Sequence, residues 1–467
     1  MMQQILLGYS SSGEISGFAY FTKTSTADGA HSSWRTGRVI TSSSKGDVFF
    51  ATSGGAATQF AIEGIDKDGN FKGRWRYSQD PNSYQGNTAV YSADDSTVIF
   101  GTNNSSNQGF FGKTDQPTVA AGGSLTSTGY RVQTTSYLVT EANVISDGTY
   151  NYFACTRGDS YDGYLLYQTN SAFNSLSSVN YKSGSSRHIL HSMDLDSNGD
   201  VWIHHSGNLS GAISDSYITK HLKTNLNSVT QYKSSQGFSQ YIDRKFFVDN
   251  NDDKYFAQPD GSGNQMYWMI TKYNSNMVRS SSARVFIGTS DSFVACDRVN
   301  GGAYVVGRGP SKDFLTVYKL SSDLSSVVWS RKMGYYNDTD GYYTPGVFEL
   351  ISGETDKEGN LLVLARTHNS SITRLGLGSG RRTSAVIRYT TDGPTGNFTS
   401  VTGQSPPESD TYFKIESISD PALSGSGTYT FSSTTDVTSR TVEFTNASDT
   451  SSWSSVSTDF QTAFEIS

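Results

Sequence analysis

Cysteine, proline and charged residues are scarce in this chain of 467 residues. It has two cysteines and nine prolines, and charged residues make up 17% of the sequence. Cys155 and Cys296 lie far apart, so they form neither a disulfide framework nor the spacing of a metal site. We expect both to be buried thiols that act as small apolar side chains. No run approaches the roughly 18 apolar residues that a membrane-spanning helix needs, which predicts no membrane insertion.

Basic clusters and targeting signals are also absent. No Lys/Arg block stands out and the formal net charge is -7, so nucleic acid is not an expected partner. The start of the chain, MMQQILLGYSSSG, has no basic segment, and its only apolar run, Ile5-Leu6-Leu7, is too short for a signal peptide. We therefore expect a protein made in a cytoplasm and not exported by the general secretory route.

The usual short signatures of enzymes are missing. The sequence contains no Gly-x-Ser-x-Gly, no His-Glu-x-x-His and no phosphate-binding Gly-rich motif. The sialidase-type box Ser-x-Asp-x-Gly-x-Thr-Trp is not matched either, because the Gly between Asp196 and Trp202 stands one place too late. This pattern favours a protein that catalyses no reaction and needs no cofactor.

The sequence is instead rich in aromatic residues and in polar turns. Aromatic residues make up 13% of the chain, and the stretch Met193 to His205 shows why. There a strand runs into a turn at Asp196-Ser197-Asn198-Gly199, and a second strand follows. Seven segments carry this hairpin signal, with turns near Ser44–Asp47, Ala93–Ser96, Ser146–Gly148, Asp196–Gly199, Asp249–Asp253, Arg298–Gly302 and Asp356–Asn360.

A second landmark follows each hairpin at a similar distance. It is an apolar strand that ends in a basic or equivalent residue, and the seven positions are Gly64, Lys113, Gln168, Lys220, Lys272, Lys319 and Arg388. Their spacing of about fifty residues, with a fourth short strand closing each unit, is typical of a β-propeller. We expect an all-β fold with seven four-stranded antiparallel blades, with the charged heads of the basic residues at the surface. The alternatives are a β-solenoid and a row of β-sandwiches.

The repeat also sets the expected domain boundaries. Residues 37–404 form the propeller, residues 1–36 are an N-terminal strand and docking segment, and residues 405–467 are a small β-rich C-terminal domain. Strands at Ile5 to Tyr9 and Gly17 to Thr22 are expected, one of which closes the ring by pairing with the last blade. Both terminal segments alternate apolar and polar residues, so they are suited to adding strands to a neighbour's sheet. The alternative is that they fold back on the propeller.

The repeat resembles known propellers. Its pattern of Asp-x-x-Gly-Asn, an apolar strand, apolar-Lys-apolar, a turn and Trp is similar to the repeats of large bacterial cell-surface proteins. The whole chain resembles virion structural proteins of tailed bacteriophages, especially marine phages, in its start Gln4-Ile5-Leu6-Leu7-Gly8-Tyr9 and its Ser/Thr/Gly/Tyr-rich texture. This resemblance implies a virion protein that is assembled in the host cytoplasm and is oligomeric within an assembly.

Two groups of residues near the fourth hairpin are of types that can bind a metal ion. The fourth unit holds His188, His191, His204, His205 and His221. Successive strand residues point to opposite faces, so His204 and His205 cannot easily share one ion, and polar filling of a blade is preferred. Asp194, Asp196 and Asn198 match the start of a calcium loop, but Trp202 stands where a later ligand belongs. A β-turn explains the same residues, and we expect no metal while leaving calcium open.

A tyrosine-rich loop is the candidate binding site. Tyr335, Tyr336, Tyr342 and Tyr343 flank Asn337-Asp338-Thr339-Asp340-Gly341 between the sixth and seventh units. Exposed tyrosines with apolar faces and hydrogen-bonding tips suit a glycan or a protein partner. The alternative is that the four rings pack against one another.

These observations lead to one main functional hypothesis and two alternatives. The main one is a non-enzymatic phage tail or tail-associated protein that acts in assembly and host attachment, with other virion proteins and a host surface glycan or receptor as partners. The first alternative is a glycan-active propeller enzyme, a hydrolase or lyase, and the second is a cell-surface adhesin. Two carboxylates about 5–10 Å apart in an axial pocket would favour the enzyme.

Overall fold

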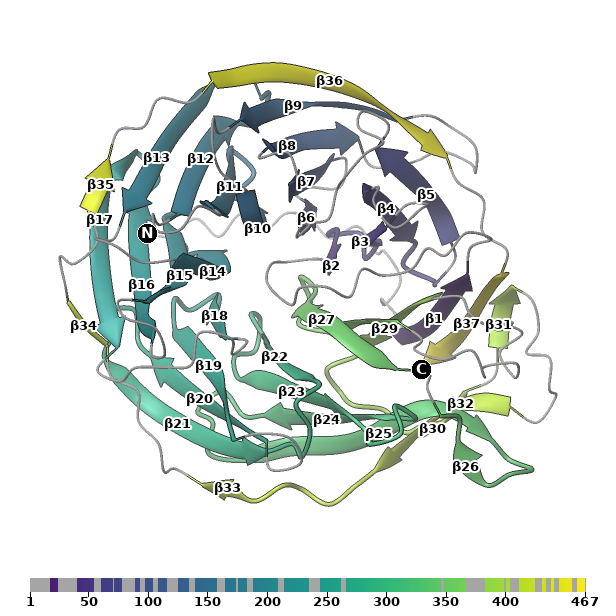
Figure 1. Cartoon of the computed structure of the whole chain (residues 1–467). Helices are drawn as coiled ribbons and strands as arrows, with labels where there is room; N and C mark the ends of the chain where they lie inside the picture. The colour runs from purple at the N-terminus through teal and green to yellow at the C-terminus, as the bar shows by residue number, and fades with distance from the viewer. Residues whose placement is uncertain are drawn as a thin grey trace, which may run out of the picture.

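The computed structural model describes most of the repeat and parts of both ends. The described residues are 17–23, 40–53, 60–69, 71–77, 89–92, 97–103, 108–115, 125–133, 139–157, 164–173, 175–182, 188–208, 214–234, 244–261, 266–345, 348–366, 383–398, 400–403, 411–424, 431–433, 438–440, 445–455 and 460–466. Their regular elements are all β-strands, and the sheets stand around a ring in a β-propeller arrangement (Figure 1). Within these ranges there is no helix of the length and apolarity needed to cross a membrane.

Three sheets have five strands each. Their first four strands follow one another in the chain and run antiparallel, and the last strand comes from the C-terminal part. The first consists of β10 (Val139–Ser146), β11 (Tyr150–Arg157), β12 (Tyr164–Asn170), β13 (Leu176–Lys182) and β35 (Thr438–Arg440). The second consists of β14 (His188–Leu195), β15 (Val201–Asn208), β16 (Ser214–Leu222), β17 (Asn225–Ser234) and β34 (Phe431–Ser433). The third consists of β18 (Lys245–Val248), β19 (Lys254–Asp260), β20 (Tyr267–Tyr273), β21 (Arg279–Phe286) and β33 (Leu423–Ser424).

Two further sheets extend the same plan. One has the order β22 (Ser292–Cys296), β23 (Ala303–Arg308), β24 (Leu315–Leu320), β25 (Val327–Asn337), β32 (Thr411–Ser417) and β30 (Gly396–Phe398), with β26 (Tyr342–Tyr343) paired to β25. The other has the order β27 (Glu349–Thr355), β28 (Leu361–Arg366), β29 (Thr383–Tyr389), β1 (Gly17–Lys23), β37 (Phe460–Ile466) and β31 (Ser400–Gly403).

The remaining sheet has nine strands and is symmetric about its fifth. Its order is β2 (Ile40–Ser42), β3 (Val48–Ser53), β4 (Phe60–Ile65), β5 (Phe71–Tyr77), β36 (Thr445–Ser455), β9 (Leu125–Gln133), β8 (Gln108–Asp115), β7 (Thr97–Asn103) and β6 (Ala89–Ser92). The long strand β36 therefore joins two meanders of four strands by their outer edges. The turn expected at Ala93–Ser96 lies outside the described residues.

Strand register confirms the repeat. Each of the seven expected positions lies on the third strand of its meander and is paired with the second strand. The pairs are Gly64 with Phe49, Lys113 with Ile99, Gln168 with Tyr152, Lys220 with Trp202, Lys272 with Tyr255, Lys319 with Tyr304 and Arg388 with Leu362. The hairpin at Asp196 has the expected chemistry, since Gly199 has a φ of 78° and donates to the carbonyl of Asp196 at 2.8 Å.

The same third-strand position links neighbouring units. Lys113 donates to the carbonyl of Ser171 at 2.7 Å, Gln168 to that of Lys223 at 2.8 Å and Lys272 to that of Ser322 at 3.0 Å. In each case the acceptor lies in the turn after the third strand of the next unit. Arg388 makes the equivalent bond to the carbonyl of Lys67 at 3.3 Å and so joins the last unit to the first.

The C-terminal segment is a belt around the ring. Its strands β32 to β36 add in turn to the outer edges of successive sheets, running back toward the beginning of the repeat, and β37 then pairs with β1. Strands β33 to β36 lie along the outside of the ring in Figure 1. The separate C-terminal β domain that the sequence suggests is not confirmed. A segment of about sixty residues buries little surface by itself, whereas each strand here satisfies its backbone groups on an existing edge.

The N-terminal strand closes the ring. Residues Gly17–Lys23 pair with β29 on one side and with β37 on the other. The expected strand at Ile5 to Tyr9 lies outside the described residues. One sheet therefore contains strands from the beginning, the end and the last repeat unit of the chain.

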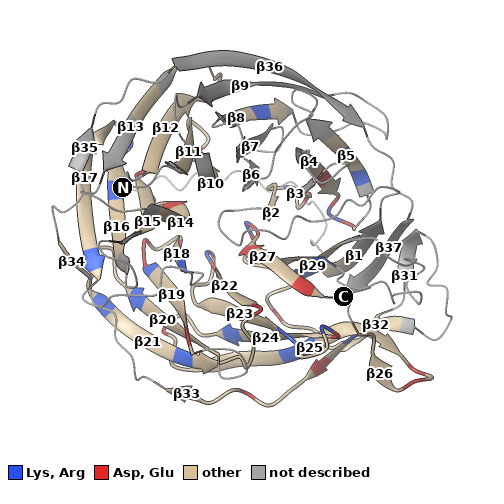
Figure 2. Cartoon of the chain, in the orientation of Figure 1, with Lys and Arg blue, Asp and Glu red and all other residues tan. Residues whose placement is uncertain are grey.

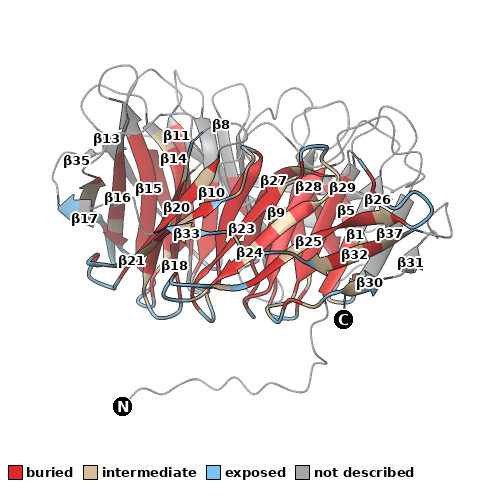
Figure 3. Ribbon diagram, turned by 90° about the horizontal axis from the view of Figure 1, so that it is seen from below, coloured by how far each residue is buried: buried red, intermediate tan, exposed pale blue. Residues whose placement is uncertain are grey.

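The core lies between the sheets. Apolar side chains of neighbouring sheets meet in clusters, such as one joining Tyr152 and Leu166 to Leu190 and Ile203. Figure 3 shows the buried strands through the disc and exposed turns along one edge. Each fully buried large apolar side chain contributes about 1.5–3 kcal/mol. Both cysteines are buried in this core as expected.

Candidate functional site

The first strands of the units surround the ring axis, and a cavity opens where they end. Because consecutive strands alternate in direction, the turns after the first strands gather on one face of the ring. The cavity has a volume of about 420 Å³ and lies among these strand ends and turns. Its lining comprises Thr41, Ser42, Ile145, Ser146, Asp147, Asp194, Leu195, Asp196, Asn250, Arg298, Val299, Glu354, Thr355, Asp356 and Lys357. We call it the outer cavity.

Turn chemistry places most of its carboxylates. Asp196 Oδ1 accepts the backbone N–H groups of Asn198 and Asp200, both at 3.0 Å, which is why an Asp begins the turn. Its Oδ2 accepts the indole N–H of Trp202 at 3.0 Å and pairs with Lys220 at 2.8 Å. Asp356 repeats the arrangement with the backbone of Glu358 and Asn360. These carboxylates are therefore held in place by hydrogen bonds within their own turns.

Arg298 lines the outer cavity and links its own sheet to three others. Its Nη1 lies 2.6 Å from Asp194 Oδ1 and 2.5 Å from Oδ2, and its Nη2 lies 3.3 Å from Glu354 Oε1. The same Nη1 also reaches the carbonyl of Val248 at 3.3 Å. Asp194 additionally accepts the N–H groups of Leu195 and Val248. Two carboxylates from different sheets therefore share one guanidinium. Acidic segments are visible on both β14 and β27 in Figure 2.

The electrostatics keep this group charged. Burial alone lowers the pKa of Arg298, but the charges of Asp194 and Glu354 outweigh it and raise the pKa above its ordinary value. Burial raises the pKa of Asp356, which Arg388 opposes. A fixed cation flanked by carboxylates in a partly enclosed cavity can stabilise developing charge without reorganising.

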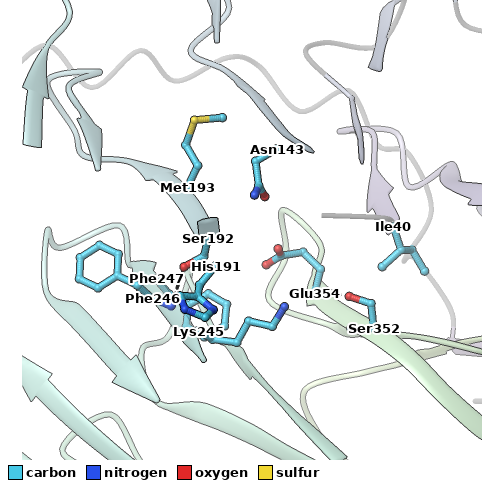
Figure 4. A pocket seen from close by; sticks show the side chains of 11 residues that line it. Ile40, Asn143, His191, Ser192, Met193, Lys245, Phe246, Phe247, Ser352 and Glu354 are labelled. Atoms are coloured by element: carbon cyan, nitrogen blue, oxygen red, sulfur yellow. Dashed lines mark hydrogen bonds between the residues drawn. The ribbon is translucent and has the colours of Figure 1, made fainter. Parts of the chain in front are cut away.

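A smaller cavity continues along the axis. It has a volume of about 20 Å³, and Glu354 lines both cavities. Ile40, Asn143, His191, Ser192, Met193, Lys245, Phe246, Phe247, Ser352 and Gly353 complete its lining. In Figure 4 the side chains of Asn143, Lys245 and Glu354 point toward one another, with His191 and Ser192 beside them. We call it the inner cavity. A Cβ atom at Gly353 would overlap the Phe293 ring, so this wall requires glycine.

The histidine cluster is not gathered around one point. As expected, His204 and His205 lie on opposite faces of β15: His204 contacts Phe256, and His205 contacts Tyr164. His204 bonds the hydroxyl of Ser216 at 2.8 Å, and His205 bonds that of Thr219 at 3.0 Å. The side chain of His188 lies outside the described residues. Within the described part of the chain, no group of three or more His, Cys, Asp or Glu side chains is placed to hold a metal.

The proposed calcium ligands Asp194 and Asp196 already have protein partners in the structure. Asp194 is held by Arg298, whereas Asp196 is held by its own turn, by Trp202 and by Lys220. The two carboxylates thus have separate sets of protein donors. The β-turn interpretation explains Asp194, Asp196 and Asn198, and the binding of calcium by these residues stays untested.

The four tyrosines are not jointly exposed. Tyr335 is fully buried in the core and Tyr343 is 6% exposed, whereas Tyr342 is 46% exposed. Strand β26 folds back on β25, so that Tyr336 pairs with Tyr343 and their ring centroids lie 5.1 Å apart. The expectation of four exposed rings is wrong because this segment is a hairpin whose side chains alternate between core and surface. Its role in binding stays untested.

Arg298 and Glu354 are the site residues that sequence reasoning missed. Arg298 begins one of the turns that the hairpin pattern located and Glu354 lies just before another, but nothing local distinguishes them from other residues near turns. The signal that could have found them is the repeat itself. Once equivalent turns are placed around one axis, charged residues flanking different turns must approach one another.

Comparisons with known proteins identify no family for this chain. No family model matches the chain, and no curated protein matches it. Among solved structures, the polysaccharide lyase Uly1 is similar with a TM-score of 0.48 at 10% identity, covering 79% of this chain and 97% of that chain. The Dos1 propeller is similar with a TM-score of 0.38 at 10% identity, covering 82% of this chain and 97% of that chain.

A third similar structure is the subtype N11 neuraminidase-like protein of A/flat-faced bat/Peru/033/2010 (H18N11). Its TM-score is 0.36 at 10% identity, covering 80% of this chain and 97% of that chain. The findings correct the main functional hypothesis. The hypothesis of a non-enzymatic phage tail protein has no support, because no family model and no curated protein matches the chain. Two of the similar structures are a polysaccharide lyase and a neuraminidase-like protein. Such distant likenesses assign no activity, which has to be argued from the site.

Proposed function

We propose that this chain is a glycan-active β-propeller enzyme that cleaves a glycosidic bond in the outer cavity. The observation that carries the proposal is the pair Asp194 and Glu354, held by one guanidinium at the ring axis. Glycoside hydrolysis needs two carboxylates flanking the bond that breaks. A cavity of about 420 Å³ lies in the size range of small-molecule sites.

The two carboxylates take different roles. Asp194 is locked by Arg298 and by two backbone N–H groups, so it is a fixed negative charge that stabilises an oxocarbenium-like transition state. Glu354 lies at the junction of the two cavities and transfers the proton. In its protonated form it gives its proton to the leaving oxygen as the glycosidic bond breaks, and it becomes the carboxylate that pairs with Arg298. It then takes one from the water whose oxygen bonds to the anomeric carbon.

Release of reducing ends from a panel of neutral and acidic polysaccharides tests this function. Glu354→Gln keeps an acceptor for Arg298 but cannot transfer a proton, so turnover should fall at least about 100-fold. Glu349→Gln is the matched control: Glu349 lies at the other end of the same strand and pairs with Arg366 at 2.7 Å, and turnover should persist. Equal turnover in both variants would refute the role of Glu354. An unsaturated product without hydrolysis would identify a lyase instead.

We also propose that the ring has seven blades, formed by residues 37–404 together with β1, which is the fourth strand of the last blade. The support is the nine-stranded sheet, which divides at β36 into two meanders of four strands, β2 to β5 and β6 to β9. Gly64 and Lys113 occupy equivalent register positions in these two halves. Counting the halves separately gives seven equivalent units around the axis.

A further inference from the structure

The inner cavity contains buried polar atoms that have no protein partner. The Nδ2 atom of Asn143 and the Nδ1 atom of His191 make no hydrogen bond, although the residues are only 3% and 2% exposed. They come from neighbouring sheets, on β10 and β14, and both line this cavity. Buried donors are nearly always satisfied by protein, water or a ligand. The two atoms therefore mark a place where something binds.

The surroundings favour an acceptor of hydrogen bonds. Asn143 Nδ2 can only donate, and Lys245 brings a positive charge to the cavity wall. His191 Nε2 lies 2.8 Å from Ser206 Oγ, which can supply a proton and leave the proton of the ring on Nδ1. Burial and the charges of Arg244 and Lys245 hold the pKa of His191 well below its usual value, so the ring is neutral. The negative charge of the nearby Glu354 carboxylate is balanced by Arg298, whose Nη2 lies 3.3 Å from Glu354 Oε1.

We propose that the inner cavity binds one monovalent anionic atom, held by Asn143, His191 and Lys245. Its volume of about 20 Å³ admits a single particle of about the size of a water molecule. The atom is either a free halide ion or one carboxylate oxygen of an acidic sugar whose ring lies in the outer cavity. The second source rests on the proposed function, because Glu354 is the point at which the two cavities meet.

Crystals grown or soaked in bromide test the site directly. We expect an anomalous peak between Asn143 and Lys245 in the wild type, and a rise in the unfolding midpoint with bromide concentration. Asn143→Leu and Lys245→Met should lose both signals. Asn276→Leu, a change of the same kind at an exposed turn, should keep them. A peak-free cavity that holds only water, with the same salt response in all four proteins, would overturn the proposal.

Glucuronate and glucose separate the two sources. If the anionic atom belongs to a sugar carboxylate, glucuronate should displace the bromide peak and bind the wild type but not Lys245→Met, whereas glucose should do neither. If bromide binds and glucuronate does not displace it, the site takes a free halide. These readouts need no turnover, so they stand even if Glu354→Gln proves as active as the wild type.

Discussion

Buried histidines make the folded chain sensitive to mild acid. Burial lowers the pKa of His191 and His204 well below the usual value, and it lowers that of His221 to about 4. His221 is held by the hydroxyl of Tyr164 at 2.7 Å and by the carbonyl of Leu226 at 2.8 Å. The unfolded chain protonates these rings near pH 6.5, whereas the folded chain does not. The folded state therefore has its full advantage above pH 6.5 and loses it as the pH falls.

We predict that the free energy of unfolding drops steeply between pH 6.5 and about pH 5. Each of the three histidines should contribute a loss of about 2 kcal/mol over that interval. Denaturant titrations at a series of pH values measure it, and His221→Gln should reduce the slope by about a third. A flat profile would show that these rings are protonated in the folded protein.

Among the basic residues at the repeat position, we expect the substitution of Arg388 to lower the free energy of unfolding most. It is fully buried, lies 3.5 Å from Asp356 and donates to the carbonyls of Gly46 and Lys67 in the first unit. Removing it leaves Asp356 as an uncompensated buried charge. Arg388→Met should lower the free energy of unfolding by about 3–5 kcal/mol.

Two variants serve as controls for Arg388. The double variant Arg388→Met/Asp356→Asn should recover part of the loss, because the buried charge is gone. Lys67→Met removes an exposed pair with Asp68 and should change little. If Arg388→Met and Lys67→Met were equally stable, the ion pair would have no role in closing the ring.

At the residue scale, sequence patterns predict the strand on which a residue lies better than they predict whether its side chain is buried. The repeat predicts Lys220, Lys319 and Arg388 on equivalent strands, as the structure has them, but it also predicts that their charged heads lie at the surface. Lys319 is 6% exposed and pairs with Asp297, and Arg388 with Asp356. The expectation is wrong for these two residues because the first acid of the hairpin turn lies across the strands from them. Linear spacing does not reveal that approach.

The belt strand β32 should be as important to stability as a strand of the repeat. Phe413 pairs with Tyr335, is fully buried and packs in the core cluster of β22 to β29. Phe413→Ala should cost about 3–5 kcal/mol, as for other buried aromatic residues. Its neighbour Tyr412, which points outward and bonds Asp338 at 3.1 Å, should cost only about 1 kcal/mol when changed to Ala. Equal small losses would mean that the belt is dispensable.

At the element scale, strands were easier to predict than their partners. Alternation of apolar and polar residues predicts strands in the C-terminal segment, and β36 (Thr445–Ser455) is one of the strands found among its described residues. Alternation says which face of a strand is buried, but not which edge it joins. Alternation alone therefore predicts a separate C-terminal domain and a loop at Tyr342–Tyr343, whereas the structure has belt strands on the sheet edges and the return strand of a hairpin.

The whole ring should unfold in one step. Strand β1 lies between β29 and β37, so the beginning, the end and the last repeat unit depend on one another. Trp75, Trp202, Trp268 and Trp329 are buried in four different sheets and report on them together. We predict one coincident transition by fluorescence and circular dichroism. An earlier separate transition would show that the belt or one sheet unfolds independently.

For the molecule as a whole, the repeat made the architecture predictable and left the site unpredictable. Turn chemistry and a period near fifty residues suffice for a propeller, because closing the ring protects the sheet edges. The axial site instead combines Asp194, Arg298 and Glu354 from three sheets. No two of them are close in sequence, so their meeting depends on the ring being closed.

The most direct test of the proposed activity is a structure of Glu354→Gln with an oligosaccharide that the wild type cleaves. The substitution should slow cleavage while leaving the outer cavity intact. We predict a sugar ring in the outer cavity, with the scissile oxygen beside residue 354 and Asp194 still paired with Arg298. A sugar bound only on the opposite face or on the rim of the disc, with the outer cavity empty of it, would contradict the account.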